Sequence, residues 1–505
     1  MLSVIPGVCS THRERICATI PIMTPRSKQQ EDGSGNQCER GGFQLFRQRR
    51  AKELGHLFMP LFGFAFVRAF NGATLAFSAE AFGVDVWLGQ DILSATMIAL
   101  FFLGIVFARK LAPLWSHRPL VGAATMAMVI SALGQGWGAA LSPNVAALFV
   151  VLGAAGGAVS ILLWAELESC LNTLRIVLYV SGAFLFGDAL GWVLQDLEGF
   201  RRVLGVGALP LLSLGCLIAS YRSIPNDERP PSDWGTLKFP WRLVLVLGVY
   251  EFVLGFNEAM APADEGAAFL LGASAAAVLV FLTTFFLSHR FDFAQMFRTP
   301  FLFVACGLLA TFLSMGSPGT FSMFLVALGY SLMFLLLTIL LCDLSHRYGI
   351  SVLVLCGVEE LMAIFMIAGH RCALAMEDGA LVGFVDESAL RVALVVVVLL
   401  VSACTLFGER RWGLTFFGVG GLSAEADERG RFLAHCASMA DAYRLSPRES
   451  EVFQLLALGK SPASIEHELC IANGTLKSHT RRIYQKFNVH SRDELRRLVG
   501  EPPRG

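Results

Sequence analysis

Twelve long apolar stretches between residues 55 and 408 constrain the fold of this chain more than any other feature. A helix that crosses the hydrocarbon core of a bilayer needs about 20 consecutive apolar residues. Only 16% of the residues are charged, against about 25% in a soluble globular protein. The composition therefore excludes one large soluble domain and a long disordered chain. The predicted spanning helices cover residues 55–79, 86–108, 119–141, 144–168, 171–195, 203–221, 241–261, 265–288, 299–316, 320–343, 349–370 and 389–408.

Basic residues lie in alternate connections between the predicted spans. Arg109 and Lys110 follow the second span, and Arg410 and Arg411 follow the twelfth. The connection at residues 222–240 carries further bases between the sixth and seventh spans. Because cytoplasmic loops of membrane proteins carry an excess of Lys and Arg, we expect both termini to lie on the cytoplasmic side.

The polar, Pro-rich connection at residues 222–240 divides the predicted spans six and six. Two sets of six helices joined by a polar loop resemble the major facilitator superfamily. That superfamily has a Gly/Asp/Arg-rich signature in its second-to-third loop, whereas Ala108–Pro113 has the basic residues without the Gly and Asp pattern. The resemblance implies an all-α polytopic bundle of about 12 transmembrane helices (6+6), with transport as an alternative function.

Three segments flank the predicted twelve-helix membrane domain at residues 55–408. Residues 1–54 are polar and basic, and we expect them to be disordered. They lack the apolar region of a signal peptide, so we expect none there. Residues 409–440 are expected to form a juxtamembrane linker, with a short helix at about 423–441. Residues 441–505 are expected to form a small soluble domain.

The C-terminal domain shows clear helix boundaries. Ser446 and Glu449 have the spacing of a capping box, with Pro at the first helical position. A second helix starts at Ser461, and a short turn leads to a third from about Thr475 to Phe487. Ser491 opens a fourth helix. Two short helices joined by a tight turn are typical of the helix-turn-helix arrangement.

The third helix of this domain is basic. Its apolar residues recur at helical spacing and should face the small core. Lys477 and Arg481 are four residues apart and share a face that fits the major groove, where Lys and Arg bind guanine. Arg482 and Lys486 form a second such pair suited to phosphates. The alternative is a basic helix that is merely solvated.

Four blocks of this domain carry a family resemblance: Leu445–Val452, Gly459–Ser461, Thr475–His479 and Ile483–Arg492. Together they closely resemble the LuxR-type DNA-binding domain, a four-helix helix-turn-helix domain. The resemblance implies that the third helix binds double-stranded DNA, that the domain binds as a homodimer on two half-sites, and that RNA polymerase is a further partner. The predicted DNA-binding residues are Thr475, Lys477, Ser478, His479, Arg481, Arg482 and Lys486, of which Lys477, Ser478 and Arg481 should face the bases.

Two positions depart from the pattern of the LuxR family. The family has a Glu-Ile-Ala run in the second helix, where this chain has Ser464, Ile465 and Glu466. It has Ser before the third helix, where this chain has Ala472. Loss of a helix cap costs about 1 kcal/mol, although Asn473 could replace it. An acidic Glu466 would weaken packing or DNA affinity.

Several polar residues lie inside the predicted spans, where charge is costly and usually faces a cavity or a partner. We hypothesise a pocket between the two halves, in which Arg68 holds an anionic or phenolic group and the carboxylates bind a cation, an amine or a proton. The alternative is that Arg68 pairs with one carboxylate and locks two helices. The candidate pocket residues are Arg68, Asp91, Asp188, Glu251, Asn257, Glu258, Glu359 and Glu360.

The sequence lacks the patterns that catalysis would need. We find no phosphate-binding Gly loop, no metal cluster and no nucleophile with a base, so we expect neither an enzyme nor a cofactor. The 12 Cys are scattered without a C-x-x-C pair, and we interpret them as buried apolar residues rather than disulfides or metal ligands.

The whole chain resembles membrane-embedded LuxR-type regulators, in which a twelve-helix domain is fused to this DNA-binding domain. The resemblance implies a one-component transcriptional regulator in the bacterial inner membrane, with both termini cytoplasmic, whose membrane domain senses an unidentified small molecule. One alternative is a major-facilitator-like transporter that carries a regulatory DNA-binding tail. Another is a mere membrane anchor, against which the intramembrane carboxylates argue, because an anchor needs one span and no charges.

Overall fold

The structure is a computed structural model of the 505-residue chain. Its secondary structure is helical throughout the described residues, which confirms the expected all-α class. The residues described are 36–82, 86–137, 141–195, 197–224, 241–260, 266–287, 299–313, 319–348, 350–377, 424–469 and 471–500, with a few positions between 389 and 400.

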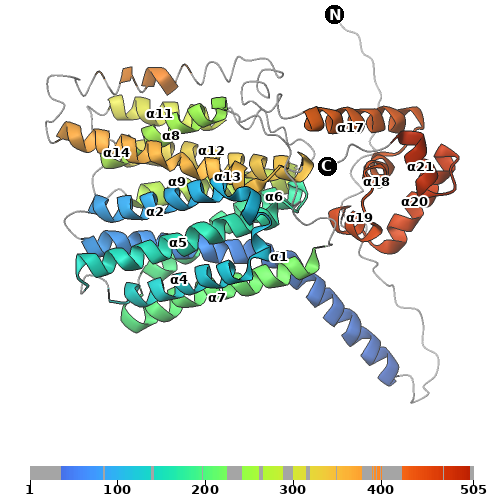
Figure 1. Cartoon of the computed structure of the whole chain (residues 1–505), viewed down its shortest axis with the longest axis horizontal. Helices are drawn as coiled ribbons and strands as arrows, with labels where there is room; N and C mark the ends of the chain where they lie inside the picture. Colours follow the sequence, from blue (N-terminus) through green and yellow to red (C-terminus); the bar gives the residue numbers. More distant parts are fainter. Residues whose placement is uncertain are drawn as a thin grey trace, which may run out of the picture. The chain divides into compact units, whose positions relative to one another are not determined.

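The membrane part of the chain consists of apolar helices joined by short connections (Figure 1). The first half contains α1 (Asn36–Phe82), α2 (Val86–Val106), α3 (Ala108–Leu111), η2 (Leu114–Ser116), α4 (Arg118–Gln135), α5 (Pro143–Glu168), α6 (Thr173–Gln195) and α7 (Gly199–Ser223). The second half contains α8 (Trp241–Ala259), α9 (Gly266–Leu287), α11 (Thr299–Leu313), α12 (Thr320–Tyr348), α13 (Val352–Leu361) and α14 (Ala363–Glu377).

Helices occupy the first eleven of the predicted spanning ranges. Seven of the described helical segments are long and apolar enough to cross a bilayer by length and composition. The protein is therefore a multi-pass membrane protein. The twelfth predicted span, at 389–408, lies mostly outside the described residues, so the total of twelve stays a prediction.

Two helix boundaries differ from the predicted ones. Helix α1 begins at Asn36, so residues 36–54, which we expected to be disordered, are helical. Their Arg, Gln, Glu, Lys and Ala residues favour a helix. The predicted helix at 349–370 is interrupted, because the Met362 N–H donates to the Glu359 carbonyl three residues back and ends α13 in a tight turn.

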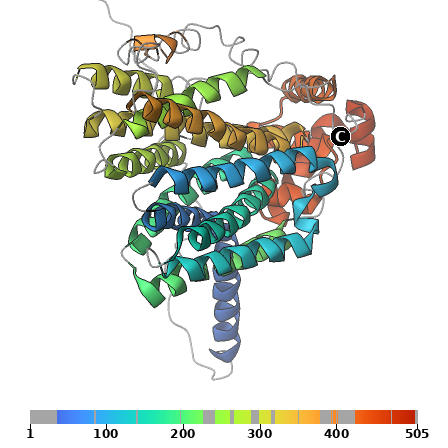
Figure 2. The same cartoon turned by 60° about the vertical axis from the view of Figure 1, so that its left-hand side comes forward.

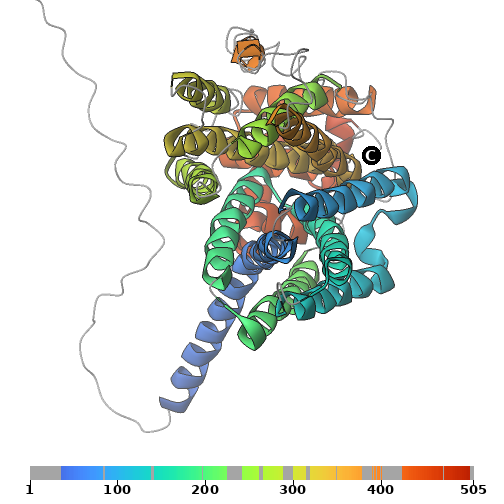
Figure 3. The same cartoon turned by 90° about the vertical axis from the view of Figure 1, so that its left-hand side faces the viewer.

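The membrane helices form two groups, which Figures 1, 2 and 3 show from three sides. In the first group α4 packs against α5 and α7, and in the second α9 and α11 pack against α12. Contacts of α6 with α9 and of α2 with α13 join the two groups. One buried core runs through both, with Trp164 from α5, Tyr250 from α8 and Leu336 from α12.

Helices α8 and α14 approach closely because two glycines lie at their crossing. A Cβ atom at Gly255 would lie 2.1 Å from the Met366 carbonyl oxygen, and one at Gly369 would lie 2.2 Å from the Phe252 carbonyl oxygen. Only glycine permits backbones this close, as is common where membrane helices pack. The crossing fixes the position of α8, which carries Glu251.

The C-terminal part is a module of five helices with its own core. These are α17 (Ala424–Ala442), α18 (Pro447–Ala457), α19 (Pro462–Leu469), α20 (Asn473–Phe487) and α21 (Arg492–Val499). Phe453, Ile465, Ile483 and Leu495 are fully buried in this core. Helix α17 corresponds to the short helix expected at about 423–441.

Local signals in the C-terminal module act as the sequence predicts. The Ser446 Oγ accepts from the Glu449 backbone N–H, and the Glu449 carboxylate accepts from the Ser446 backbone N–H at 2.9 Å, which completes the capping box of α18. Ser491 caps α21 through the Glu494 N–H. Asn488 ends α20 in the left-handed conformation, as helix C-termini commonly do.

Candidate DNA-binding surface and intramembrane acidic cluster

Helix α20 presents its basic residues outward because its apolar stripe is buried. Leu476, Ile483 and Phe487 face the core. Lys477 and Arg481 are exposed, in agreement with their predicted shared face. Thr475, Ser478 and Arg482 are exposed as well, and His479 is partly buried.

An open groove of about 670 Å³ runs beside α20. Lys477 and Arg481 line it, and they are joined by Thr480, Tyr484 and Arg492, which we did not predict from the sequence. Thr480 and Tyr484 carry hydroxyl groups three and seven residues after Lys477, so helical spacing alone could have placed them on this face.

Lys486 lies against the capping box rather than facing outward alone. Its Nζ donates to the Glu449 carboxylate at 2.7 Å and to the Arg444 carbonyl at 2.8 Å. Burial raises the pKa of Glu449, but the hydrogen bonds from Lys486 and Ser446 outweigh it and hold that pKa below its usual value. Lys486 therefore stabilises the module, whereas its predicted contact with phosphate remains a prediction.

The two departures from the LuxR pattern lie on either side of the turn between α19 and α20. Ala472 is the N-cap of α20 and makes no side-chain cap, and Asn473 is the first residue of the helix. The Asn473 side chain donates instead to the Glu466 carboxylate on α19. Glu466 is thus hydrogen-bonded to the first residue of α20, and the side chain of Asn473 does not replace the missing cap.

Arg68 pairs with Asp188 within the membrane domain. Its Nη2 donates to Asp188 Oδ1 at 3.0 Å, and its guanidinium carbon lies 3.4 Å from the centre of the Phe184 ring. These contacts join α1 to α6. The geometry favours the alternative in which Arg68 locks two helices, because its charge is already balanced.

Two other candidate pocket residues have partners of their own. Asp91 on α2 forms an ion pair with Arg371 on α14. Asn257 on α8 lies with its Nδ2 3.0 Å from the Met323 sulfur on α12. The structure gives no direct contact between these residues and Arg68.

Four of the candidate carboxylates lie on α8 and α13. We define them as the acidic cluster: Glu251 and Glu258 on α8, and Glu359 and Glu360 on α13. Glu251 is 4% exposed and Glu359 is 3% exposed. Glu251 lies within electrostatic range of Glu258, Glu359 and Glu360, and Glu359 also lies within range of Glu360. Glu360 is in turn within range of Arg68. Four of the predicted carboxylates thus share one region of the membrane domain.

Hydroxyl groups from α12 bind two members of the acidic cluster. Tyr330 donates to Glu251 Oε1 at 3.0 Å, and Thr338 donates to Glu359 Oε1 at 2.7 Å. The second oxygen of Glu251 is buried without a hydrogen-bond partner among the described residues. We did not predict Tyr330 or Thr338, since uncharged hydroxyls in an apolar helix give little signal.

Two acids at the end of α5 were also missed. Glu166 accepts from the backbone N–H groups of Leu114 and Trp115 at 2.6 and 2.9 Å and from the Tyr221 hydroxyl at 3.1 Å. It therefore fixes the connection between α2 and α4. Glu168 is 1% exposed, and neither of its carboxylate oxygens has a hydrogen-bond partner in the part of the chain described.

Comparisons with known proteins place the C-terminal module in a family. Residues 443–499 match the luxR family of bacterial regulatory proteins. Over 74 residues the chain is 39% identical to "Probable transcriptional regulatory protein NarL" of Mycobacterium tuberculosis (strain ATCC 25618 / H37Rv), which covers 15% of this chain and 31% of that protein. Over 63 residues it is 36% identical to "Uncharacterized transcriptional regulatory protein YvfU" of Bacillus subtilis (strain 168), covering 12% and 32%.

The chain spans about a third of the length of these curated relatives. Among solved structures, the chain is similar to the major facilitator superfamily transporter FucP in the outward conformation, with a TM-score of 0.45 and 14% identity over 70% of this chain and 98% of that one. The protein is thus a membrane domain fused to a LuxR-type helix-turn-helix domain.

Proposed function

We propose that this chain is a one-component regulator of the bacterial cytoplasmic membrane, whose membrane domain binds a small molecule and thereby controls DNA binding. The acidic cluster is the observation that carries the proposal, because it places four carboxylates, with Glu251 and Glu359 buried, in the membrane domain of a chain that also has a LuxR-type domain. Buried charge in a membrane domain marks a functional site by default. A passive anchor has no need of it.

The acidic cluster favours a cationic ligand, such as an organic amine or a proton. Arg68 is balanced by Asp188, so the cluster keeps an excess of acid that a cation would relieve. The unpaired oxygen of Glu251 supplies an acceptor. The ligand controls the protein only if it binds one conformation of the membrane domain more tightly than the other.

The DNA-binding module acts on double-stranded DNA through Lys477, Ser478 and Arg481. In this proposal it binds as a homodimer on two half-sites about one helical turn apart, and RNA polymerase is the partner at the promoter. Both termini lie in the cytoplasm, and the tether to the membrane domain keeps the module close to the inner face of the membrane.

The first experiment compares transcripts in the native host for the wild type and the Lys477→Ala/Arg481→Ala variant at matched protein levels. Arg497→Ala, which removes an exposed base from α21, is the control. We expect a small set of genes to change in the double variant alone, with DNA affinity reduced about 100-fold. If no transcript changes, the regulator proposal fails.

The ligand half of the proposal is tested by Glu251→Gln on the same transcripts. This variant should lose the response to the stimulus and keep the DNA affinity of the wild type, because α20 is untouched. Glu198→Gln, at the start of α7, is the control. An unchanged response in Glu251→Gln would show that the acidic cluster is not the ligand site.

The second candidate function is a transporter that carries a regulatory tail, with proton coupling through Glu251 or Glu359. The same acidic cluster favours it, since transporters use buried carboxylates as proton relays. Uptake of the ligand into proteoliposomes faster than into empty vesicles would support transport. Uptake no faster than in empty vesicles supports the sensor.

A further inference from the structure

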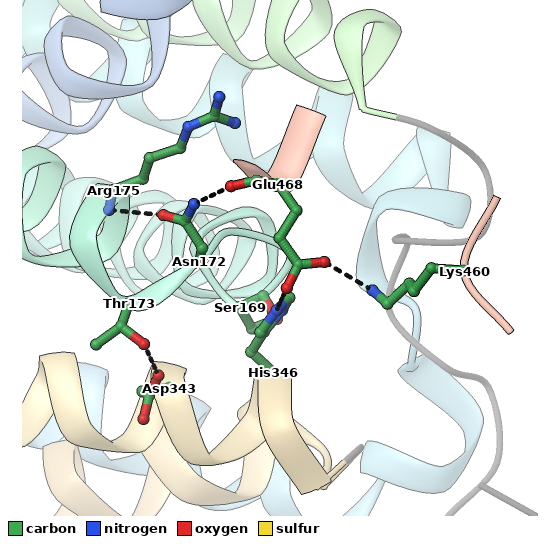
Figure 4. Close-up of polar contacts among 8 residues, drawn as sticks. All are labelled: Ser169, Asn172, Thr173, Arg175, Asp343, His346, Lys460 and Glu468. Carbon is green, nitrogen blue, oxygen red and sulfur yellow. Dashed lines mark hydrogen bonds and ion pairs between the residues drawn. The ribbon is translucent and has the colours of Figure 1, made fainter. Parts of the chain in front are cut away.

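Glu468, near the end of α19, contacts the membrane domain. Its backbone carbonyl accepts from the Asn172 side-chain amide at 2.5 Å (Figure 4). Its carboxylate lies with Oε1 3.9 Å from His346 Nε2 and with Oε2 3.6 Å from Lys460 Nζ. The side chains of Glu468 and His346 are 17% and 14% exposed, so the contact is largely screened from water.

The two partners of Glu468 in the membrane domain, Asn172 and His346, each have a second contact there. Asn172 is the residue before α6, and its Oδ1 accepts from the Arg175 backbone N–H at 3.0 Å, as an N-cap does (Figure 4). His346, near the end of α12, has its Nδ1 3.0 Å from the Ser169 carbonyl. The imidazole therefore lies between the Ser169 carbonyl and the Glu468 carboxylate.

The charges at this contact favour its formation. Burial raises the pKa of Glu468, but the nearby His346 side chain and the charge of Lys460 outweigh it, so that pKa lies below its usual value. The carboxylate is consequently ionised where it meets His346. An ionised group that is mostly buried depends on its partners, because removing one of them leaves the charge uncompensated.

Helix α12 links this contact to the acidic cluster. It carries Tyr330 and Thr338, which bind Glu251 and Glu359, and it ends beyond His346. Asp343 on the same helix accepts from Thr173 at the start of α6. A movement of α12 against α6 would therefore change the cluster and the surroundings of Glu468 together, because a helix moves as a rigid element.

We propose that the contact of Glu468 with Asn172 and His346 is an autoinhibitory latch, which holds the DNA-binding module on the membrane domain and lowers its occupancy of DNA. The latch acts through α19, the helix directly before the turn into α20. The latch would let ligand binding in the membrane domain control α20. This link to a ligand rests on the proposed function.

The test separates the latch from the cap of α6. Asn172→Asp and Asn172→Ser both keep an oxygen that caps α6, but Asp loses the donor to Glu468 and Ser shortens it. His346→Ala removes the second partner. The control is His117→Ala, which removes an imidazole that contacts the Lys110 carbonyl instead. All variants are compared as full-length protein at equal levels.

Chromatin immunoprecipitation of the full-length protein measures the latch in cells without stimulus. We expect Asn172→Asp and Asn172→Ser each to raise promoter occupancy about fivefold, the effect of losing one hydrogen bond. His346→Ala should raise it as well, with His117→Ala at the wild-type level. Equal or lower occupancy in the three variants would overturn autoinhibition.

A second measurement tests the latch without reference to DNA. Amide hydrogen exchange of residues 462–469 in the full chain in nanodiscs should be faster in Asn172→Asp than in His117→Ala. Unchanged exchange would refute docking, even where the regulator proposal holds. Faster exchange in a protein whose transcripts never change would keep the docking and reject the regulator.

Discussion

At the scale of single residues, the contacts of Arg68 indicate a structural role. It pairs with Asp188 and lies over Phe184, and a guanidinium with one carboxylate and one aromatic face has its main partners in place. We therefore assign Arg68 to the packing of α1 against α6. In the acidic cluster, by contrast, Glu360 lies only within electrostatic range of Arg68. Among the described residues, no ion pair joins a base to the cluster.

This assignment predicts a difference between single and double substitutions. Arg68→Leu leaves Asp188 buried and unpaired, so we expect a large loss of folded protein, on the order of 3–5 kcal/mol for a buried pair. Arg68→Leu/Asp188→Leu should recover most of it and still respond to the stimulus. Size-exclusion chromatography in detergent measures the folded fraction, and loss of the response in the well-folded double variant would return Arg68 to the ligand site.

Because the pKa of Glu449 is lowered in the folded module, we expect the free energy of unfolding of the DNA-binding module to fall in acid. Its pKa lies below the unfolded value because Lys486 and Ser446 bind the carboxylate. The stabilisation is present above the unfolded pKa of about 4.3 and is lost as the pH falls through the lower folded pKa. We expect about 1 kcal/mol of unfolding free energy to depend on this group.

Urea unfolding of residues 424–505, which have a core of their own, measures this dependence between pH 7 and pH 3. Glu449→Gln should be less stable at pH 7 and should lose less stability in acid than the wild type. Glu451→Gln, on the exposed side of α18, is the comparison. An equal acid response in the Glu449→Gln and wild-type modules would disprove the assignment.

At the scale of elements, the crossing of α8 and α14 sets where the acidic cluster lies. The Gly255 Cα faces the Met366 carbonyl so closely that a methyl group does not fit. Overpacking of this kind costs about 1–3 kcal/mol, and the two helices would have to separate. Because Glu251 and Glu258 flank Gly255 on α8, the separation would also disturb the cluster.

Gly255→Ala is therefore expected to lower the thermal stability of the detergent-solubilised protein and to weaken the response. Gly122→Ala on α4 is the matched control, since a Cβ there meets nothing within 4 Å. Fluorescence-monitored thermal unfolding of both variants provides the measurement. Equal melting temperatures would mean that α8 and α14 tolerate a wider separation.

At the scale of the whole molecule, α12 connects the acidic cluster with the residues that contact Glu468. One part of it hydrogen-bonds to Glu251 and Glu359, and its end places His346 beside Glu468. A ligand that draws the acidic cluster together would act on the position of this helix. The proposed regulator therefore needs no separate signalling domain between ligand and DNA-binding module.

Much of this organisation follows from local sequence patterns. Capping by Ser446 and Ser491, the apolar stripe of α20 and the exposure of Lys477 and Arg481 each depend on residues of a single helix and its cap. Short-range hydrogen bonds and helical periodicity are encoded in the order of residues. For the same reason the apolar stretches predicted the helices of the membrane domain.

Other features were decided only by the tertiary structure. Arg68 could have paired with any of several carboxylates, and Lys486 could have faced solvent, until packing placed Asp188 and Glu449 beside them. The contact of Asn172 with Glu468 joins residues 296 positions apart. The chain by itself determined which segments are helical and which helix is basic, because those properties are local. Which charges are neutralised, and which surface holds α19, depended on distances that only the packed helices define.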